Sequence, residues 1–167
     1  RGSINGFAET PMTYRSGLDS WIVTVQAGSA NANAGFLFSP VGASFNPKWA
    51  NGASVSLNTK SIWYANGADG LYNQTSGSYY TFISSDRSAG TNAEGYVFET
   101  SATPTSVTNV TQVPLIGSVT ARQAVVVTAT TGTALPSGQK VYLRYAPGGN
   151  YSSAVVLEMT HAGGNDY

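Results

Sequence analysis

The stretch that decides the fold reads Trp21-Ile22-Val23-Thr24-Val25-Gln26, then a small polar connector, then Phe36-Leu37-Phe38-Ser39-Pro40 and Lys48-Trp49. In an extended chain Trp21, Val23 and Val25 share one face, and this period of two indicates a half-buried β-strand. The two Phe residues share a face in the same way. Because residues 27–35 contain only Ala, Gly, Ser and Asn, they are expected to connect the two runs. The stretch therefore predicts a β-hairpin at the centre of a β-sandwich core, with Trp21 as a structural residue.

Similar short runs, separated by turn residues, continue through the first hundred residues. Alternating apolar and polar side chains predict further strands at residues 12–14, 55–57, 79–84 and 95–100. No window shows apolar residues at the helical spacing of 3.6 together with capping residues. The sequence therefore predicts an all-β fold, with a first, aromatic-rich β-sandwich over residues 1–103.

The composition changes after Thr103-Pro104, which is expected to be a linker. Aromatic residues become rare, and short β-branched runs follow at residues 107–113, 123–130, 140–145 and 154–159. That spacing is typical of an immunoglobulin-like sandwich, which usually has about seven strands. Residues 104–167 are therefore expected to form a second antiparallel sandwich that is incomplete, either truncated or completed by another strand.

Composition also narrows the classes of partner. Charged residues make up 10% of the chain, against roughly 25% in typical soluble domains, and eight acidic side chains balance eight basic ones. Nucleic-acid binding needs a basic surface to neutralise phosphate, so no nucleic-acid partner is expected. No apolar run is long enough for a transmembrane helix, and no membrane insertion is expected. The absence of Cys excludes disulfides and thiolate metal sites.

No residue pattern predicts catalysis or a cofactor. The single His, His161, lies beside two glycines in an expected loop, and a catalytic triad would have to use it. Asp69, with Asn66 and Asn73 nearby, could offer oxygen ligands to Ca²⁺, but the EF-hand spacing is absent, and such residues are common in turns for backbone reasons. No spacing singles out a pair of carboxylates for glycoside hydrolysis. We therefore expect no enzyme activity, no metal and no cofactor.

Aromatic side chains in the first half offer a binding surface instead. Aromatic rings can stack on the CH face of a sugar, while neighbouring amides bond its hydroxyl groups. Trp49 stands close to Asn51, and Trp63 stands close to Tyr64 and Asn66, on expected loops. These five residues are the candidate glycan-binding set. The alternative places Trp49 and Trp63 in the core, because Trp is mostly buried on average.

Several motifs also carry a resemblance to known modules. In the first half they are Pro11-Met12-Thr13-Tyr14-Arg15-Ser16-Gly17, Trp21-Ile22-Val23-Thr24-Val25-Gln26, Phe36-Leu37-Phe38-Ser39-Pro40, Lys48-Trp49-Ala50 and Thr75-Ser76-Gly77-Ser78-Tyr79-Tyr80-Thr81-Phe82. Together they resemble modules of large secreted Bacteroidota proteins exported by the type 9 secretion system. Later in the chain, Lys140-Val141-Tyr142-Leu143-Arg144-Tyr145, followed by residues 153–159, resembles an immunoglobulin-like module of the same proteins. The order of the first-half motifs is also distantly similar to starch-binding sandwich modules, in which loop aromatics stack on glucan.

These observations lead to two functional hypotheses. The first is a non-catalytic structural or adhesive module of a bacterial surface or secreted assembly, with a location that is extracellular or at the cell surface. Its partners would be a second copy or neighbouring modules of a parent protein, joined by β-strand complementation at an open sheet edge. The alternative is a carbohydrate-binding module for a starch-like glycan.

Overall fold

The computed structural model describes residues 1–6, 8–16, 19–40, 42, 46–87, 90–137, 139–146, 148 and 154–167. Gly17 and Ser153, at the ends of two of the quoted motifs, lie outside this set. The chain divides into two compact units, Arg1–Ser101 and Ala102–Tyr167, and the predicted boundary at Thr103 lies beside that division. The expected all-β fold of antiparallel strands is confirmed. Near the N-terminus Ser3–Asn5 forms the 3-10 turn η1.

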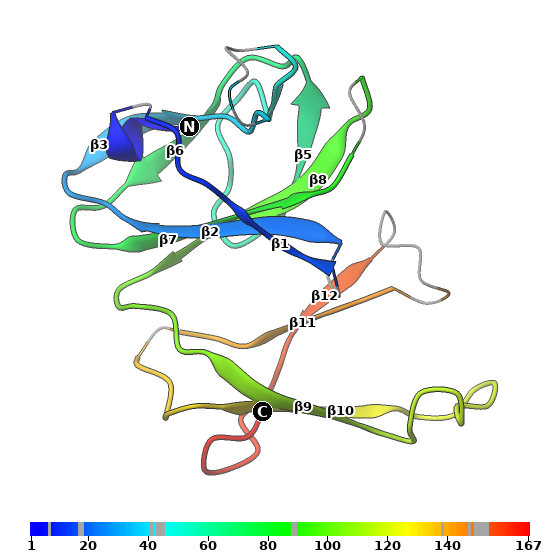
Figure 1. The fold of residues 1–167 in the computed structure, drawn as a ribbon. Helices are drawn as coiled ribbons and strands as arrows, with labels where there is room; N and C mark the ends of the chain where they lie inside the picture. Colours follow the sequence, from blue (N-terminus) through cyan, green and yellow to red (C-terminus); the bar gives the residue numbers. More distant parts are fainter. Residues whose placement is uncertain are drawn as a thin grey trace. The chain divides into compact units, whose positions relative to one another are not determined.

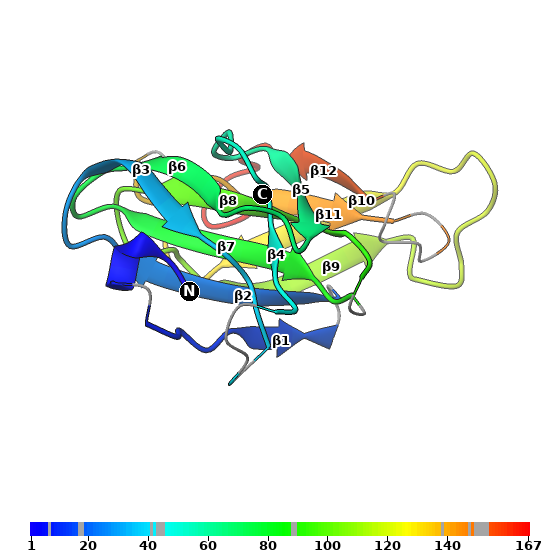
Figure 2. The same ribbon diagram turned by 90° about the horizontal axis from the view of Figure 1, so that it is seen from above.

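Unit 1 is built from two antiparallel sheets (Figure 1). The larger has six strands in the order β1-β2-β7-β8-β5-β4, and the smaller pairs β3 with β6. The bounds are β1 Thr13–Arg15, β2 Ser20–Gln26, β3 Asn31–Phe36, β4 Trp49–Ala50, β5 Lys60–Ala65, β6 Gly70–Gln74, β7 Tyr79–Ser85 and β8 Ala93–Thr100. In Figure 2, seen from above, β3 and β6 overlie β7, so the small sheet covers one face of the large one.

The predicted hairpin between residues 21–26 and 36–40 is wrong. β2 pairs with β1 on one side and with β7 on the other, whereas β3 pairs with β6. The connection between β2 and β3 therefore crosses from one sheet to the other. The connection is also shorter than the expected residues 27–35, because Asn31–Gly35 already belongs to β3. Ala34 is completely buried there, so the second half of this strand of small residues packs into the core, while residues 31–33 are exposed. The strand expected at residues 55–57 is reduced to a bridge from Ser54 to Leu71.

An aromatic cluster fills the space between the two sheets. Phe36 lies at its centre, and its ring centroid is 5.5 Å from that of Trp63 and 5.2 Å from that of Phe82. Phe38 and Tyr72 complete the contacts around it at 5.7 and 5.8 Å. Because these side chains come from both sheets, their burial holds the sandwich together.

Two glycines make room for this cluster. A Cβ atom on Gly70 would lie 2.7 Å from the Phe36 ring. A Cβ atom on Gly95 would lie 1.8 Å from the Ile83 carbonyl oxygen and 2.4 Å from the Trp63 indole nitrogen. Both positions are strand residues at which a side chain would displace an aromatic ring or a neighbouring backbone.

Unit 2 contains four described strands in two antiparallel pairs. They are β9 Val107–Val113, β10 Val126–Thr131, β11 Tyr142–Tyr145 and β12 Val155–Glu158. Each falls within or close to a run that the sequence predicts, and the described part of the unit has fewer strands than the roughly seven of an immunoglobulin sandwich. No helix in the described residues has the length and apolar character to cross a membrane.

Candidate functional site

A cleft of about 360 Å³ opens on unit 1 where several segments meet. Trp21 near the start of β2 and Ser84–Ser85 at the end of β7 form one part, and Trp49 of β4 forms another. The lining residues are Arg1, Glu9, Thr10, Pro11, Met12, Trp21, Leu37, Phe38, Ser39, Pro40, Trp49, Ser84, Ser85, Asp86 and Arg87. Most of this surface is apolar, and a few charged groups stand among the apolar ones, as in sites for small molecules.

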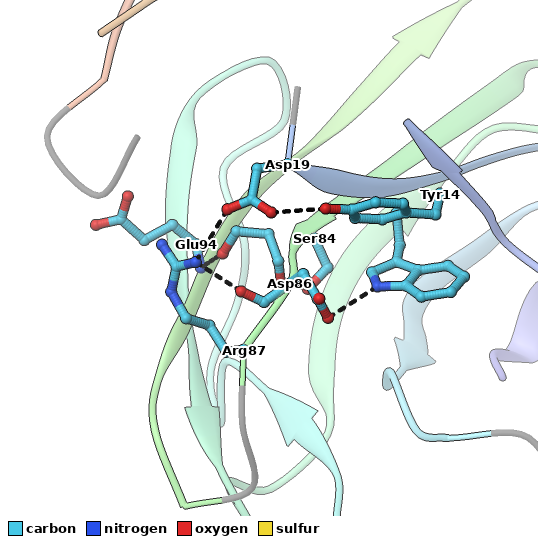
Figure 3. Close-up of polar contacts among 8 residues, drawn as sticks. Tyr14, Asp19, Ser84, Asp86, Arg87 and Glu94 are labelled. Atoms are coloured by element: carbon cyan, nitrogen blue, oxygen red, sulfur yellow. Dashed lines mark hydrogen bonds and ion pairs between the residues drawn. The ribbon is translucent and has the colours of Figure 1, made fainter. Parts of the chain in front are cut away.

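Trp21 is held in the cleft by contacts on two sides. Its indole N–H donates a hydrogen bond to the Asp86 carboxylate, with 3.1 Å between Nε1 and Oδ1 (Figure 3). Its ring lies 5.2 Å from the ring of Tyr14, its cross-strand partner on β1. On the other side β7 places Ser84 opposite Trp21 in the ladder. The Trp21 side chain is 39% exposed, so it keeps open surface while its orientation is fixed.

A second layer of contacts steadies the groups around Trp21. The Tyr14 hydroxyl donates to Asp19 Oδ1 at 2.8 Å, and this hydrogen bond raises the pKa of Tyr14 above its ordinary value. Arg87 forms an ion pair with Asp19 at 3.6 Å and donates to the Asp86 carbonyl oxygen at 2.6 Å. The Asp86 N–H also donates to the Asp19 carbonyl oxygen at 3.1 Å. Figure 3 shows these side chains converging, so the network ties the β1–β2 turn to the end of β7.

Trp49 enters the cleft from a different part of the sheet. Its backbone pairs with Phe38 through two hydrogen bonds of 2.9 Å, and its indole N–H donates to the Thr91 carbonyl oxygen at 2.8 Å. The side chain is half-buried against the aromatic cluster. Both cleft tryptophans thus have satisfied indole N–H groups, and their ring surfaces remain the part available to a ligand.

The side-chain charges that line the cleft balance. Arg1 and Arg87 contribute two guanidinium groups, and Glu9 and Asp86 contribute two carboxylates. Arg1 forms an ion pair with Glu9, and the hydrogen bond from its guanidinium holds the pKa of the Glu9 carboxyl below its ordinary value. Both carboxylates can accept hydrogen bonds from hydroxyl groups, and both guanidinium groups can donate them.

The predicted glycan-binding residues do not form one site. Trp63 is completely buried, and its indole N–H donates to the Ile83 carbonyl oxygen at 3.2 Å. Its assignment to a sugar-stacking surface is therefore wrong, and the core alternative is right. Tyr64 follows it on β5 and points to the opposite face, 47% exposed. Asn51 donates from its side chain to the Ile62 carbonyl oxygen at 3.1 Å, and Asn66 has a φ of 58°, typical of a turn. Of the five residues, only Trp49 lines the cleft.

The residues that sequence reasoning missed are Trp21 and the segment Ser84–Arg87. Trp21 alternates with Val23, which indicated a core position, and Val23 does pack against the aromatic cluster. Trp21 is expected to be structural and does contact Tyr14 and Asp86, but at 39% exposure it lies at the cleft and outside the buried core. The run Ser84-Ser85-Asp86-Arg87 is the part of the sequence that could have indicated the cleft, because two small residues at the end of a strand leave room beside a large side chain on the neighbouring strand.

Two further centres that the sequence raises without favouring them are Ca²⁺ at Asp69 and catalysis at His161. Lys48 forms an ion pair with Asp69 at 3.2 Å, so this carboxylate already has a cationic partner. His161 is exposed and contacts the Gly164 carbonyl oxygen at 3.1 Å. In the part of the chain that the structure describes, no three His, Asp or Glu side chains are grouped as a metal site would require.

Comparison of the chain with protein-family models, with curated proteins and with solved structures found no match.

Proposed function

We propose that the chain is a non-catalytic adhesive module of the cell surface or extracellular space, and that unit 1 binds a neutral glycan in its cleft. One observation carries this proposal: two tryptophans from different strands, Trp21 and Trp49, line the same cleft. Each has its indole N–H bound within the protein. A ligand therefore meets aromatic surface at both places, with hydrogen-bonding groups beside it.

The chemistry of the lining favours a sugar. Sugar rings present CH groups that stack on aromatic faces, and hydroxyl groups that need donors and acceptors. Asp86 stands next to Trp21 as an acceptor, and Arg87 follows as a donor. The volume of about 360 Å³ falls in the range of about 300–1,000 Å³ that is usual for small-molecule sites. Because the lining charges balance, a neutral ligand fits better than an acidic or basic one.

Binding is favoured over glycoside hydrolysis. A hydrolase needs one carboxylic acid that stays protonated to serve as the general acid, so its pKa must be raised. The pKa of Glu9 is lowered instead, mainly by its hydrogen bond from Arg1. Asp86 is positioned by the hydrogen bond that its carboxylate accepts from the Trp21 indole N–H. These contacts suit groups that hold a ligand.

The direct test is retention of the full chain on glycans. Affinity electrophoresis in gels containing starch, followed by a panel of other neutral polysaccharides, measures binding without labels; the starch probe follows from the motif resemblance. Trp21→Ala and Trp49→Ala should each weaken binding at least about tenfold, because losing one stacked aromatic costs roughly 1.5 kcal/mol or more. Tyr64→Ala is the matched control, since it removes an exposed aromatic of unit 1 that does not line the cleft.

The outcomes separate the hypotheses. Retention that depends on Trp21 and Trp49 but not on Tyr64 supports the glycan cleft. Retention lost equally in Tyr64→Ala would move the site away from the cleft. If the native chain binds none of the neutral polysaccharides, or binds only acidic ones such as heparin, the proposal fails and a purely structural module is the better account.

A further inference from the structure

The two edges of the β9–β10 pair in unit 2 are not equivalent. The outer edge of β10 is covered by the segment Asn165–Tyr167. Ala129 N donates to the Tyr167 carbonyl oxygen at 2.9 Å, and Tyr167 N donates back to the Ala129 carbonyl oxygen at 3.0 Å. Asn165 adds a third bond, from Thr131 N at 2.9 Å. This edge cannot accept another strand without first losing these contacts.

The outer edge of β9 carries no such cover in the described part of the chain. Among the residues that the structure describes, β9 forms its ladder with β10 alone, and no further backbone hydrogen bond joins any of its seven residues to another segment. In an antiparallel pair, every second residue turns its N–H and C=O groups away from the partner. β9 therefore presents a row of free donors and acceptors along one side.

The side chains of β9 do nothing to protect this edge. Proteins usually guard exposed edges with Lys, Pro or very short strands, and unit 1 follows the rule with a β1 of three residues and a β4 of two. β9 reads Val107-Thr108-Asn109-Val110-Thr111-Gln112-Val113, with five β-branched residues, no charge and no Pro. Its three valines are 48%, 61% and 67% exposed. Such a segment has the composition of a strand that pairs with another chain.

We propose that the β9 edge binds the β9 edge of a second copy of this chain, in antiparallel register about a two-fold axis at Val110. In that register Val110 faces its own copy, and Val107 faces Val113 of the second copy. Thr108 then faces Gln112, and Asn109 faces Thr111. The pattern of apolar and polar residues is symmetric about Val110. Each apolar side chain therefore meets an apolar one, and the absence of charge avoids like-charge pairs. A bulge between Val107 and Asn109 limits the regular ladder to the residues around Val110.

The same geometry sets the size of the assembly. Joining two β9 edges gives a four-stranded sheet with β10 at both outer positions. Each β10 is already covered by the Asn165–Tyr167 segment of its own chain. The contact uses the same patch on both copies, and the segment Asn165–Tyr167 blocks each outer β10 at Ala129 and Thr131. The contact therefore closes at a dimer and does not continue into a fibre. This inference concerns unit 2 and does not depend on glycan binding in unit 1.

The test uses two variants of the full chain with matched controls. Val110→Lys places two ammonium groups opposite each other at the two-fold axis and should raise the dimer dissociation constant at least about tenfold, as measured by sedimentation equilibrium. Ile116→Lys introduces the same charge at a side chain that is 87% exposed and lies beyond the strand. It should leave the dimer unchanged.

The second variant, Val110→Cys, tests the proposed register of the two β9 strands directly. The chain contains no Cys, so Val110→Cys introduces a single thiol. Antiparallel partners have Cα atoms about 4.5–5.5 Å apart, within the range of about 4.4–6.8 Å that a disulfide spans. Val110→Cys should therefore form a disulfide-linked dimer on mild oxidation, much faster than Ile116→Cys.

Two results would overturn the proposal. One is a native chain that remains monomeric in sedimentation at millimolar concentration. The other is a dimer that survives Val110→Lys while the two Cys variants cross-link at equal rates. If Val110→Lys fails to fold, as judged by circular dichroism, the relative rates of the two Cys variants decide the question.

Discussion

Replacing Trp63 with Ala should destabilise unit 1 far more than any change at an exposed aromatic. Trp63 has no exposed surface, and its ring lies 5.5 Å from Phe36 and 5.4 Å from Phe38. The substitution removes these contacts and leaves a cavity between the two sheets. It also removes the donor of the hydrogen bond to the Ile83 carbonyl oxygen.

The expected magnitude follows from these losses. Large-to-small changes of a buried Trp cost about 3–5 kcal/mol of unfolding free energy. A domain of this kind has a total stability of only about 5–15 kcal/mol, so the variant keeps at best part of its stability. Tyr64→Ala, one residue along the same strand and 47% exposed, should change the stability by less than about 1 kcal/mol.

Tryptophan fluorescence during urea unfolding provides the assay. All three Trp residues of the chain lie in unit 1, so the signal reports this unit alone, and Trp21 and Trp49 remain as probes in the Trp63→Ala variant. With a urea slope of about 2 kcal/mol per molar, the loss lowers the midpoint by roughly 1.5–2.5 M. Equal midpoint shifts for Trp63→Ala and Tyr64→Ala would refute the assignment of Trp63 to the core.

Three further predictions concern packing, pH and the cleft. Gly70→Ala should cost about 1–3 kcal/mol in the same assay, because its Cβ would lie 2.7 Å from the Phe36 ring; an unchanged midpoint would contradict this packing. Burial raises the pKa of the Tyr72 phenol above its ordinary value of 10.0, so the resulting stability is present below about pH 10 and is lost as the pH rises further. The drop in the urea midpoint between about pH 8 and pH 11 should therefore be smaller in Tyr72→Phe than in the native chain. An equal drop in both would contradict the contribution of the buried Tyr72 phenol. Asp86→Ala should weaken glycan binding several-fold, because it removes the acceptor that orients the Trp21 indole. Asp86→Asn keeps an acceptor oxygen and should bind the glycan as the native chain does. Weak binding by Asp86→Asn would point to a role for the negative charge of Asp86.

Much of the fold follows from local patterns. Period-two alternation and turn residues locate β1, β2, β7 and β8 of unit 1 and the four runs of unit 2. The strand β3 escaped prediction because Asn31–Gly35 contains only Ala, Asn and Gly, which give no alternating signal. What makes it a strand is its pairing with β6 and the close packing that Ala34 allows. Such pairing is a long-range property that a local pattern does not contain.

The candidate site was harder to predict for a related reason. Alternation shows which side chains share a face of a sheet, but not how far the opposite sheet covers that face. Val23 lies under the aromatic cluster, whereas Trp21, on the same strand, lies at the cleft. For Trp63 the error was in the other direction, since a surface position was predicted for a buried residue. Its neighbours Tyr64 and Asn66 are exposed, while its own side chain points into the core.

The central claim, that a glycan binds between Trp21 and Trp49, is tested most directly by the three indole N–H signals in a nitrogen–proton correlation spectrum. Variants in which each Trp is replaced by Phe assign these signals. On titration with a polysaccharide that retains the protein, the signals of Trp21 and Trp49 should move, and that of the buried Trp63 should stay in place. Movement of the Trp63 signal alone, or glycan binding that moves neither cleft signal, would contradict the account.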